Sequence, residues 1–197
     1  TSSSSPGISL KSEGVSYIAG SDLPAVIINV ERGGPGLGGI QPSQADYWQA
    51  TKALGHGDFQ LLVYAPASVQ EMVDYVVKAF DRADKYRMPA MILADGLLGQ
   101  MMEPVSLDFD VQPSPAKPWA TTGTKLEREH NIVNSLSLVP DELETLNFAR
   151  YERYALVEEN ETTPYLQTIM IDNKNYIENS TSTERQGKGT IEDPYLI

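Results

Sequence analysis

Three short apolar runs, at residues 25–30, 60–65 and 90–94, limit the folds open to this chain more than any other feature. Each run is bounded by turn residues, which is typical of a strand covered on both faces, and such strands occur in parallel sheets. Stretches with helical character separate the runs, so the chain alternates strand and helix. We therefore predict an α/β fold with a doubly wound, mostly parallel sheet.

The stretches before and between these runs contain start signals for helices. Ser5 is the expected N-cap of a first helix, with Pro6 at the first helical position, where its missing N–H costs nothing. That helix should end between Gly20 and Pro24. A shorter helix is expected over residues 43–54.

A third helix is predicted by the capping box that begins at Ser68 and includes Glu71. Pro89 marks the end of this segment. One side of the helix is apolar, and a stripe of this kind faces a core. The stripe comprises Val69, Met72, Val73, Val76, Val77, Phe80 and Ala83.

Ligands of open parallel sheets bind beyond the carboxyl ends of the strands, and residues 29–39, 65–68 and 95–100 lie at that edge. The first of these segments contains the glycine-rich run 33–39. A backbone without Cβ atoms lets a ligand or a partner chain approach closely. We therefore expect these glycines to form an open ledge at the site.

The chain changes character after residue 103, so we take 1–103 as the core domain. Residues 104–139 are expected to form an extended arm, a connector or an interface element. The arm is rich in proline: Pro104, Pro113, Pro115 and Pro118.

Residues 140–161 are predicted to form an amphipathic helix, which starts at Val139-Pro140. Its acidic end opposes the helix dipole, so it needs tertiary support. One side of it is formed by Leu143, Leu146, Arg150, Tyr154 and Val157. We expect residues 162–197, which are polar and rich in turn residues, to be a tail that is poorly ordered or foreign to the fold.

Composition excludes several classes of function. A net charge of −12, without clustered lysine and arginine, argues against binding to nucleic acid or to an anionic membrane. No apolar run reaches the ~20 residues of a spanning helix, so a cytoplasmic protein is expected. The chain contains no cysteine, which excludes disulfides, thiolate zinc sites and cysteine-bound iron–sulfur clusters on it.

Two motifs match cofactor signatures weakly. Residues 34–39 fit G-x-G-x-x-G, but that dinucleotide motif must open directly into a helix, and Ile40-Gln41-Pro42 intervenes. Asp95-Gly96 is similar to the start of the magnesium–diphosphate motif of thiamine enzymes, but the later asparagine is missing at the expected spacing. We interpret Asp95 as part of a strand-end turn, and expect no metal site on this chain.

Three polar side chains have two interpretations each. His56, between two glycines, either reaches a ligand or holds its loop by hydrogen bonds. Arg32 either binds a substrate carboxylate or forms an intersubunit salt bridge. His130 is expected at the surface.

Several segments together resemble one family. They are Thr1–Leu10, Glu31–Gly39, Pro42–Asp46, Gly55–Asp58 and Asp95–Val105. They look like the pyrimidine-binding domain of the thiamine-diphosphate-dependent 2-oxoacid:ferredoxin oxidoreductases, and among those like the branched-chain, 2-oxoisovalerate type of subunit. The resemblance runs from Thr1 to about Glu161 and then stops, where family members enter a second α/β domain.

The resemblance implies oxidative decarboxylation of a 2-oxoacid to acyl-CoA, with coenzyme A as acyl acceptor and electrons passed to ferredoxin. It also implies that the thiamine diphosphate is shared with a β-type partner subunit that holds the diphosphate and its magnesium. Iron–sulfur clusters would lie on other, ferredoxin-like subunits. An acidic ferredoxin would be repelled by this chain and should dock elsewhere.

Site residues follow from the same resemblance. The turn of Ser4, Ser5, Pro6 and Gly7 is expected to line the cofactor cleft, because it lies where a strand feeds a helix; a plain helix cap without a ligand is the alternative. Substrate-binding candidates are Arg32, Gln41, Ser43 and His56.

The family's activating glutamate and its Tyr-Pro-Ile-Thr-Pro loop would precede Thr1. Glu13 cannot replace that glutamate, because it lies within the first helix and not at a strand end. The chain therefore resembles an internal piece of the subunit, with no catalytic residue of its own, and we expect it to be inactive alone.

One loop bears on the substrate. The 2-oxoglutarate type usually has a basic residue after its Gly-Gly-Pro, whereas this chain has Gly39-Ile40-Gln41-Pro42-Ser43. A dicarboxylate would leave an unpaired, desolvated anion there, at a cost of several kcal/mol, roughly. A branched aliphatic 2-oxoacid is favoured. The alternatives are a 2-oxoglutarate-specific homologue, a noncatalytic assembly module that uses the arm and the last helix, and a dinucleotide-dependent dehydrogenase.

Overall fold

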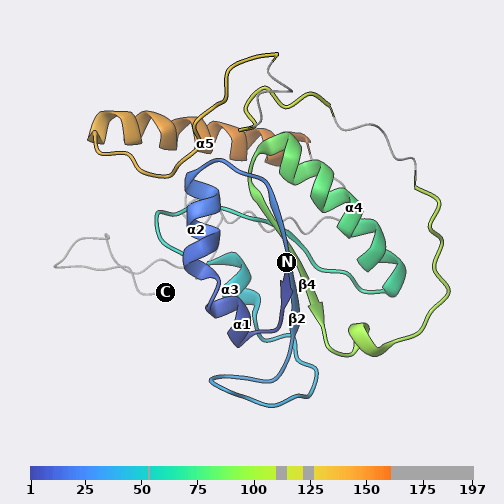
Figure 1. Ribbon diagram of the computed structural model, residues 1–197. Coiled ribbons are helices and arrows are strands. Elements are labelled where there is room, and N and C mark those ends of the chain that lie inside the picture. Colours follow the sequence, from blue (N-terminus) through green and yellow to red (C-terminus); the bar gives the residue numbers. More distant parts are fainter. Residues whose placement is uncertain (53, 110–114, 122–126, 161–197) are drawn as a thin grey trace, which may run out of the picture.

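The computed structural model describes residues 1–52, 54–109, 115–121 and 127–160. Its centre is one parallel sheet of four strands, in the order β1-β2-β4-β3 (Figure 1). The strands are β1 Ser2–Ser3, β2 Ala25–Glu31, β3 Leu62–Tyr64 and β4 Pro89–Asp95. The predicted parallel sheet is therefore confirmed, and β1 is the strand expected to lead into the turn at Ser4–Gly7.

The two central strands pair along their whole length. β2 and β4 are in register from Ala25 opposite Pro89 to Glu31 opposite Asp95. The short strand β1 extends the sheet beside β2, where the Thr1 amino group donates to the Val26 carbonyl at 2.9 Å. All carboxyl ends consequently lie at one edge of the sheet.

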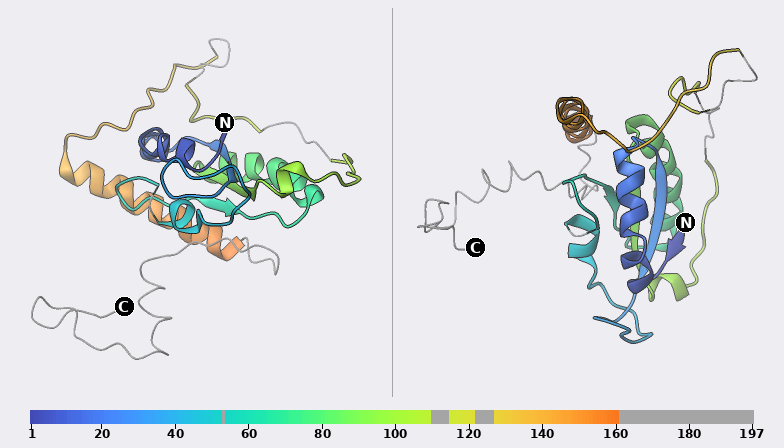
Figure 2. Two further views of the ribbon diagram at one scale, coloured as in Figure 1. Left: turned by 90° about the horizontal axis from the view of Figure 1, so that it is seen from below. Right: turned by 60° about the vertical axis from the view of Figure 1, so that its left-hand side comes forward.

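Helices cover both faces of the sheet (Figure 2). They are α1 Pro6–Ser9, α2 Ser12–Gly20, α3 Tyr47–Thr51, α4 Val69–Tyr86, the 3-10 turn η1 Leu98–Gln100 and α5 Pro140–Asn160. One face packs against α1, α2 and α3, and the other against α4. None of the helices in the described parts of the chain is long and apolar enough to cross a membrane.

The first predicted helix is divided into α1 and α2. Leu10 and Lys11 form a turn between them, and the Ser12 hydroxyl donates to the Ser9 carbonyl. A serine side chain that bonds a backbone carbonyl in this way competes with the helical pattern. The helix predicted over 43–54 is likewise shorter, because only Tyr47–Thr51 is helical.

The start of α4 confirms its predicted cap. The Ser68 hydroxyl accepts from the Glu71 N–H at 3.1 Å, and the Glu71 carboxylate accepts from the Ala67 N–H at 2.7 Å. The apolar stripe is partly wrong, because Phe80 is 60% exposed and Val77 also faces outward. Small alanines pack on the sheet instead and bring the helix axis close to it.

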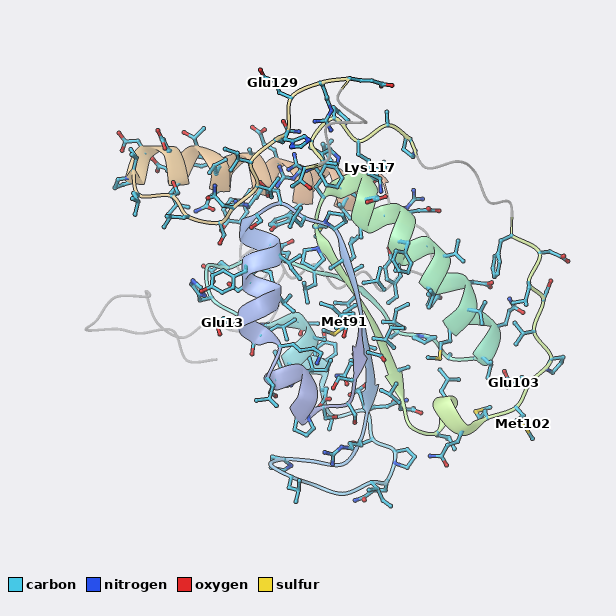
Figure 3. All side chains as sticks on the ribbon, in the orientation of Figure 1. Glu13, Met91, Met102, Glu103, Lys117 and Glu129 are labelled. Atoms are coloured by element: carbon cyan, nitrogen blue, oxygen red, sulfur yellow. The ribbon has the colours of Figure 1, made fainter. Side chains whose placement is uncertain are left out.

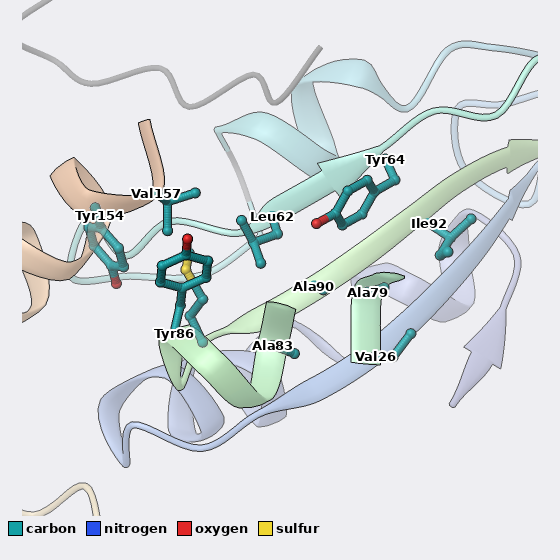
Figure 4. Close-up of a cluster of buried hydrophobic side chains, with 11 residues drawn as sticks. Val26, Leu62, Tyr64, Ala79, Ala83, Tyr86, Ala90, Ile92, Tyr154 and Val157 are labelled. Carbon is teal, nitrogen blue, oxygen red and sulfur yellow. The ribbon is translucent and has the colours of Figure 1, made fainter. Parts of the chain in front are cut away.

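The α4 side of the sheet holds the larger buried cluster (Figure 4). Its members come from β2, β3, β4, α4, α5 and the turn between α4 and β4: Val26, Leu62, Tyr64, Ala79, Ala83, Tyr86, Met88, Ala90, Ile92, Tyr154 and Val157. The opposite cluster contains Ile8, Val15, Ile27, Ala50, Leu54, Leu61, Val63 and Met91. Successive strand residues alternate between the two clusters, as the pleat of a sheet requires.

The C-terminal half of α5 docks on this core. Tyr154 and Val157 are buried beside Tyr86 and Leu62 (Figure 4), as expected from the sequence. The N-terminal half projects beyond the sheet and leaves Leu143 and Leu146 exposed, contrary to the predicted stripe.

Residues 104–109 and 115–121 of the arm run along the outside of α4, and residues 127–139 lead away from it to the start of α5 (Figure 3). Near the start of α4, the Ser106 N–H donates to Gln70 Oε1 at 2.7 Å. Near its end, Lys117 forms an ion pair with Asp84. The tail predicted over 162–197 lies outside the described residues.

Candidate functional site

Polar side chains replace apolar ones where β2 and β4 reach their carboxyl ends. On β2, Ile27 belongs to the buried cluster on the α1 side, and Asn29 and Glu31 follow it on the same face. On β4, Met91 and Asp95 also share this face, and Asp95 lies opposite Glu31 in the register. The sheet edge predicted to bind ligands therefore contains a buried polar layer.

Asn29 is at the centre of this layer and is fully buried. Its Oδ1 accepts from the Ser5 N–H at 2.9 Å. Its Nδ2 donates to Asp46 Oδ2 at 3.0 Å and to Gln49 Oε1 at 3.3 Å. One side chain thus joins the turn after β1 to the start of α3. Sequence reasoning missed this role, although a lone asparagine inside an apolar strand was the available signal.

Ser5 does not cap α1 as predicted. Its φ of 26° and ψ of −85° are unusual for a residue other than glycine, and its side chain makes no capping hydrogen bond. Its Oγ instead accepts from the Arg32 N–H at 3.1 Å and lies 3.4 Å from the Arg32 carbonyl, to which it can donate. Its own carbonyl accepts from Gln49 Nε2 at 3.3 Å.

The neighbours of Ser5 differ from it in their contacts. Ser4 Oγ is buried and has no hydrogen-bond partner among the described residues. A Cβ added to Gly7 would lie 2.0 Å from Ser3 Oγ, so a side chain there would displace the Ser3 hydroxyl. Pro6 is the first residue of α1. A buried hydroxyl without a partner suits a polar ligand atom, and the turn therefore fits the group expected there.

Carboxylates gather on the same edge. Glu31 is 3% exposed and accepts from the Asp46 N–H at 2.6 Å. Burial raises the pKa of Glu31, and the nearby charges of Asp46 and Asp95 raise it further, against the lowering by the Asp46 N–H bond. Arg32 directly follows Glu31 at this edge, and only its Nη1 is occupied, by the carbonyl oxygens of Leu37 and Gly39.

Asp95 forms the predicted strand-end turn. Its Oδ1 accepts from the Leu98 N–H and its Oδ2 from Gln44 Nε2, each at 2.8 Å. These two bonds, the first being the stronger cause, lower the pKa of Asp95. Within the described ranges, no three His, Cys, Asp or Glu side chains converge to hold a metal ion.

The glycine loop after β2 folds back on itself. The Gly33 N–H donates to the Gln41 carbonyl, and the Gly39 N–H donates to the Gly33 carbonyl. The Arg32 guanidinium closes the loop, since its Nη1 donates to the carbonyls of Leu37 at 2.6 Å and Gly39 at 2.8 Å. No helix opens from this loop, so the dinucleotide motif is not formed.

The expected open ledge is correct for only part of the run. A Cβ at Gly34 or Gly36 would meet nothing within 4 Å. A Cβ at Gly38 would lie 1.9 Å from the Gly33 carbonyl oxygen, and one at Gly39 would lie 2.0 Å from Gln41 Oε1. At these positions the missing side chain makes room for the loop's own backbone and for Gln41, not for a ligand.

Three of the four candidate substrate residues lie together, and His56 lies apart from them. Arg32 and Gln41 belong to the glycine loop, and Ser43 is half-buried just beyond it. His56 is exposed, and its Nδ1 lies 3.2 Å from Ser16 Oγ on α2, which supports its loop-holding interpretation. His130 is exposed, as expected.

Glu13 lies on the outer side of α2, away from the sheet edge (Figure 3). It is exposed, and the sequence had already excluded it as the activating glutamate.

Residues 1–175 match the family described as pyruvate flavodoxin/ferredoxin oxidoreductase, thiamine-diphosphate-binding. The match passes Glu161, where we expected the resemblance to stop. The chain is 54% identical over 162 residues to the ketoisovalerate oxidoreductase subunit VorB of Methanothermobacter marburgensis, covering 82% of this chain and 46% of that protein. The VorB of Methanothermobacter thermautotrophicus is 52% identical, with the same coverage.

Two further relatives are named for 2-oxoglutarate. The 2-oxoglutarate synthase subunit KorA of Methanothermobacter thermautotrophicus is 43% identical over 110 residues, 54% of this chain and 28% of that protein. A 2-oxoglutarate:ferredoxin oxidoreductase from Magnetococcus marinus, solved with 2-oxoglutarate, coenzyme A and succinyl-CoA bound, superposes with a TM-score of 0.64 at 23% identity. The superposition covers 81% of this chain and 33% of the Magnetococcus marinus chain, and it shows that the two share a fold. The chain spans less than half the length of the VorB relatives.

Proposed function

This chain belongs to the thiamine-diphosphate-binding domain family of the pyruvate flavodoxin/ferredoxin oxidoreductases, and from that premise we propose what the whole protein does. It is a subunit of a branched-chain 2-oxoacid:ferredoxin oxidoreductase. The reaction is the oxidative decarboxylation of a 2-oxoacid such as 3-methyl-2-oxobutanoate, with coenzyme A as acyl acceptor and ferredoxin as electron acceptor. The observation that carries this proposal is the match to the VorB relatives over 82% of the chain.

The glycine loop supports a substrate with one carboxylate. Residues 33–46 contain no lysine or arginine. Arg32 is the neighbouring cation, and the buried carboxylate of Glu31 and the half-buried carboxylate of Asp46 lie close to this edge. A second substrate carboxylate would be desolvated there without a counter-ion, which is costly.

Arg32 is the residue that we assign to the single carboxylate. Both of its side-chain hydrogen bonds come from Nη1. Its Nε and Nη2 have no hydrogen-bond partner among the described residues, and two adjacent guanidinium N–H groups suit the two oxygens of a carboxylate. Gln41 and Ser43 lie on the same loop and would border the substrate. His56 would act only through its own loop.

Ser4 and Gly7 would hold the aminopyrimidine side of the cofactor. The Ser4 hydroxyl supplies an unused polar atom, and the absence of a side chain at Gly7 keeps the turn narrow. Thiamine diphosphate, when bound, supplies the nucleophilic carbon and the electron sink that decarboxylation needs. The residues of this chain bind and orient one side of it.

The rest of the site would come from partner subunits. Apolar side chains surround the carboxyl edge in full or partial exposure: Leu37, Ile40, Trp48, Leu97 and Met102. A surface with this much exposed apolar area is typical of an interface. A β-type subunit that binds the diphosphate and magnesium would cover it, and the iron–sulfur clusters would lie on other subunits.

Substrate preference tests the proposal. The complex, purified with its partner subunits, should reduce a viologen dye with 3-methyl-2-oxobutanoate in a reaction that requires thiamine diphosphate and coenzyme A. We expect kcat/KM for this substrate to exceed that for 2-oxoglutarate by at least roughly 100-fold, a difference of about 2.7 kcal/mol. A preference for 2-oxoglutarate would reassign the protein to the second type, and no turnover of any 2-oxoacid would favour the assembly module.

A further inference from the structure

The hydrogen bonds of Ser5 connect two parts of the site that are separate in sequence. Its hydroxyl bonds the backbone N–H of Arg32 at 3.1 Å. Its backbone N–H and carbonyl bond the side chains of Asn29 and Gln49. Among the described residues, every polar group of Ser5 is therefore used inside the protein, whereas the hydroxyl of Ser4 is not.

Ser5 also has a backbone conformation that its neighbours must impose. A φ of 26° lies in the region that favours glycine, and residues there are held by the surrounding structure. The Asn29 side chain bonds the N–H of Ser5, and the Gln49 side chain bonds its carbonyl. Gln49 also donates to Ser9 Oγ at 2.7 Å. The geometry of the turn is thus fixed from α3 and β2 rather than by a helix cap.

From this geometry we propose that Ser5 is a positioning residue that couples the cofactor turn to the substrate arginine, with Asn29 and Gln49 as the side chains that hold it. The proposal deepens the function argued above and rests on it. Ser4 contacts the cofactor, Arg32 contacts the substrate carboxylate, and Ser5 sets the position of each relative to the other.

The coupling predicts a particular pattern of kinetic effects. Ser5→Ala removes the hydroxyl that holds the Arg32 backbone and retains both bonds of its own backbone. Loss of one such hydrogen bond should raise KM for the 2-oxoacid about 5-fold, with a smaller rise in the thiamine diphosphate needed for half-maximal activity. Ser4→Ala should instead raise the thiamine diphosphate requirement and leave KM for the 2-oxoacid within about 2-fold.

A double-mutant cycle separates coupling from a general structural effect. In the complex with its partner subunits, Arg32→Lys should raise KM for the 2-oxoacid, and the rise should be smaller when Ser5→Ala is already present. Ser12→Ala is the matched control, because that hydroxyl bonds the Ser9 carbonyl away from the loop. The KM of the Ser12→Ala variant for the 2-oxoacid should equal that of the unmodified protein. In the double variant with Arg32→Lys, the two effects on KM should simply multiply.

Asn29 permits a rescue experiment. Asn29→Asp keeps an acceptor for the Ser5 N–H but faces the Asp46 carboxylate, which now lies 3.0 Å from the Asn29 amide nitrogen. Adding Asp46→Asn restores this hydrogen bond in the opposite direction, because the new amide at position 46 can donate to the new carboxylate at position 29. The single variant should raise KM for the 2-oxoacid, and the double variant should bring it back to within about 3-fold.

Hydrogen exchange gives a readout that does not depend on activity. Ser5→Ala should accelerate exchange at the amides of residues 32–39, and Ser12→Ala should not. Faster exchange together with a nonmultiplicative cycle supports the proposal. Unchanged KM and unchanged exchange in folded Ser5→Ala protein would overturn it, as would a multiplicative cycle. If the unmodified complex has no 2-oxoacid activity, the proposed function is wrong, and unchanged exchange would then refute the positioning role independently.

Discussion

Asp22 should determine whether α5 stays docked on the core. It lies in the turn after α2, and its Oδ1 accepts from Arg150 Nε at 2.9 Å and from Arg153 Nη2. The Asp22 and Arg150 side chains are only 16% and 11% exposed. Arg150 also donates to the Gly20 carbonyl at 2.6 Å. These contacts fix the part of α5 that precedes the buried Tyr154.

The cost of Asp22→Ala follows from these contacts. Two charge-assisted bonds are lost, and Arg150 remains largely buried beside Arg153 without a counter-ion. Breaking a fully buried ion pair costs about 3–5 kcal/mol, and at this partial burial we expect about 2–4 kcal/mol. Asp22 has a φ of 53°, so alanine adds about 1 kcal/mol of backbone strain. We expect a total loss of about 3–5 kcal/mol in the free energy of unfolding.

Two controls separate these terms. Asp22→Asn tolerates the same φ and keeps an acceptor, so it should cost only about 1–2 kcal/mol. Asp58 is exposed with a φ of 51°, so Asp58→Ala should show the strain alone, about 1 kcal/mol.

Urea unfolding measures these free energies, and hydrogen exchange along Pro140–Val157 reports the docking of α5. The reasoning is refuted if Asp22→Ala costs no more than Asp58→Ala, or if exchange along α5 does not change.

Three further predictions concern the cap, the buried carboxyl and the loop. Ser68→Ala should lower the free energy of unfolding by about 1 kcal/mol in urea, because it removes the acceptor for the Glu71 N–H; a loss below a few tenths would contradict the capping role. The pKa of Glu31 is raised above its ordinary value of 4.5, so the folded state holds this proton more tightly than the unfolded state does. The stability that this proton contributes is complete below pH 4.5 and is lost as the pH rises through the folded pKa. Glu31→Gln should therefore gain stability relative to the unmodified protein as the pH rises above about 4.5, and a difference independent of pH would refute this. Gly38→Ala, whose Cβ would lie 1.9 Å from a backbone oxygen, should open the glycine loop and raise KM for the 2-oxoacid by roughly 10-fold or more, whereas Gly36→Ser, with open space at the same sign of φ, should change it less.

The layered sheet could be predicted because its signals are local. Apolar runs, a capping box and turn residues located β2, β3, β4 and α4 within a few residues. The strand β1 has no apolar run, since Ser2 and Ser3 are polar; a strand was expected there only from the position of the turn that follows it. The rotation of α4, which turns Phe80 outward, likewise depends on which alanines fit closest to β4.

The position of the site could be predicted from the sequence, but the contacts among its residues could not. Topology placed the Ser4–Gly7 turn and the glycine loop at the carboxyl edge, and the structure has both there. A lone asparagine inside an apolar strand was a local signal for Asn29, but the hydrogen-bond partners of Asn29 and Gln49 are far away in sequence, so no pattern indicated what they hold. The expectation of an open ledge was wrong at Gly38 and Gly39, because periodicity does not tell which chain segment fills the space that a glycine leaves.

Hydrogen exchange of the complex with and without thiamine diphosphate tests the central claim most directly, namely that the carboxyl edge of this sheet faces the cofactor. The account predicts slower exchange on cofactor binding at residues 4–9 and 29–39, and no change along the outer face of α4. Protection confined to α4 and the arm, with residues 4–9 unaffected, would contradict it.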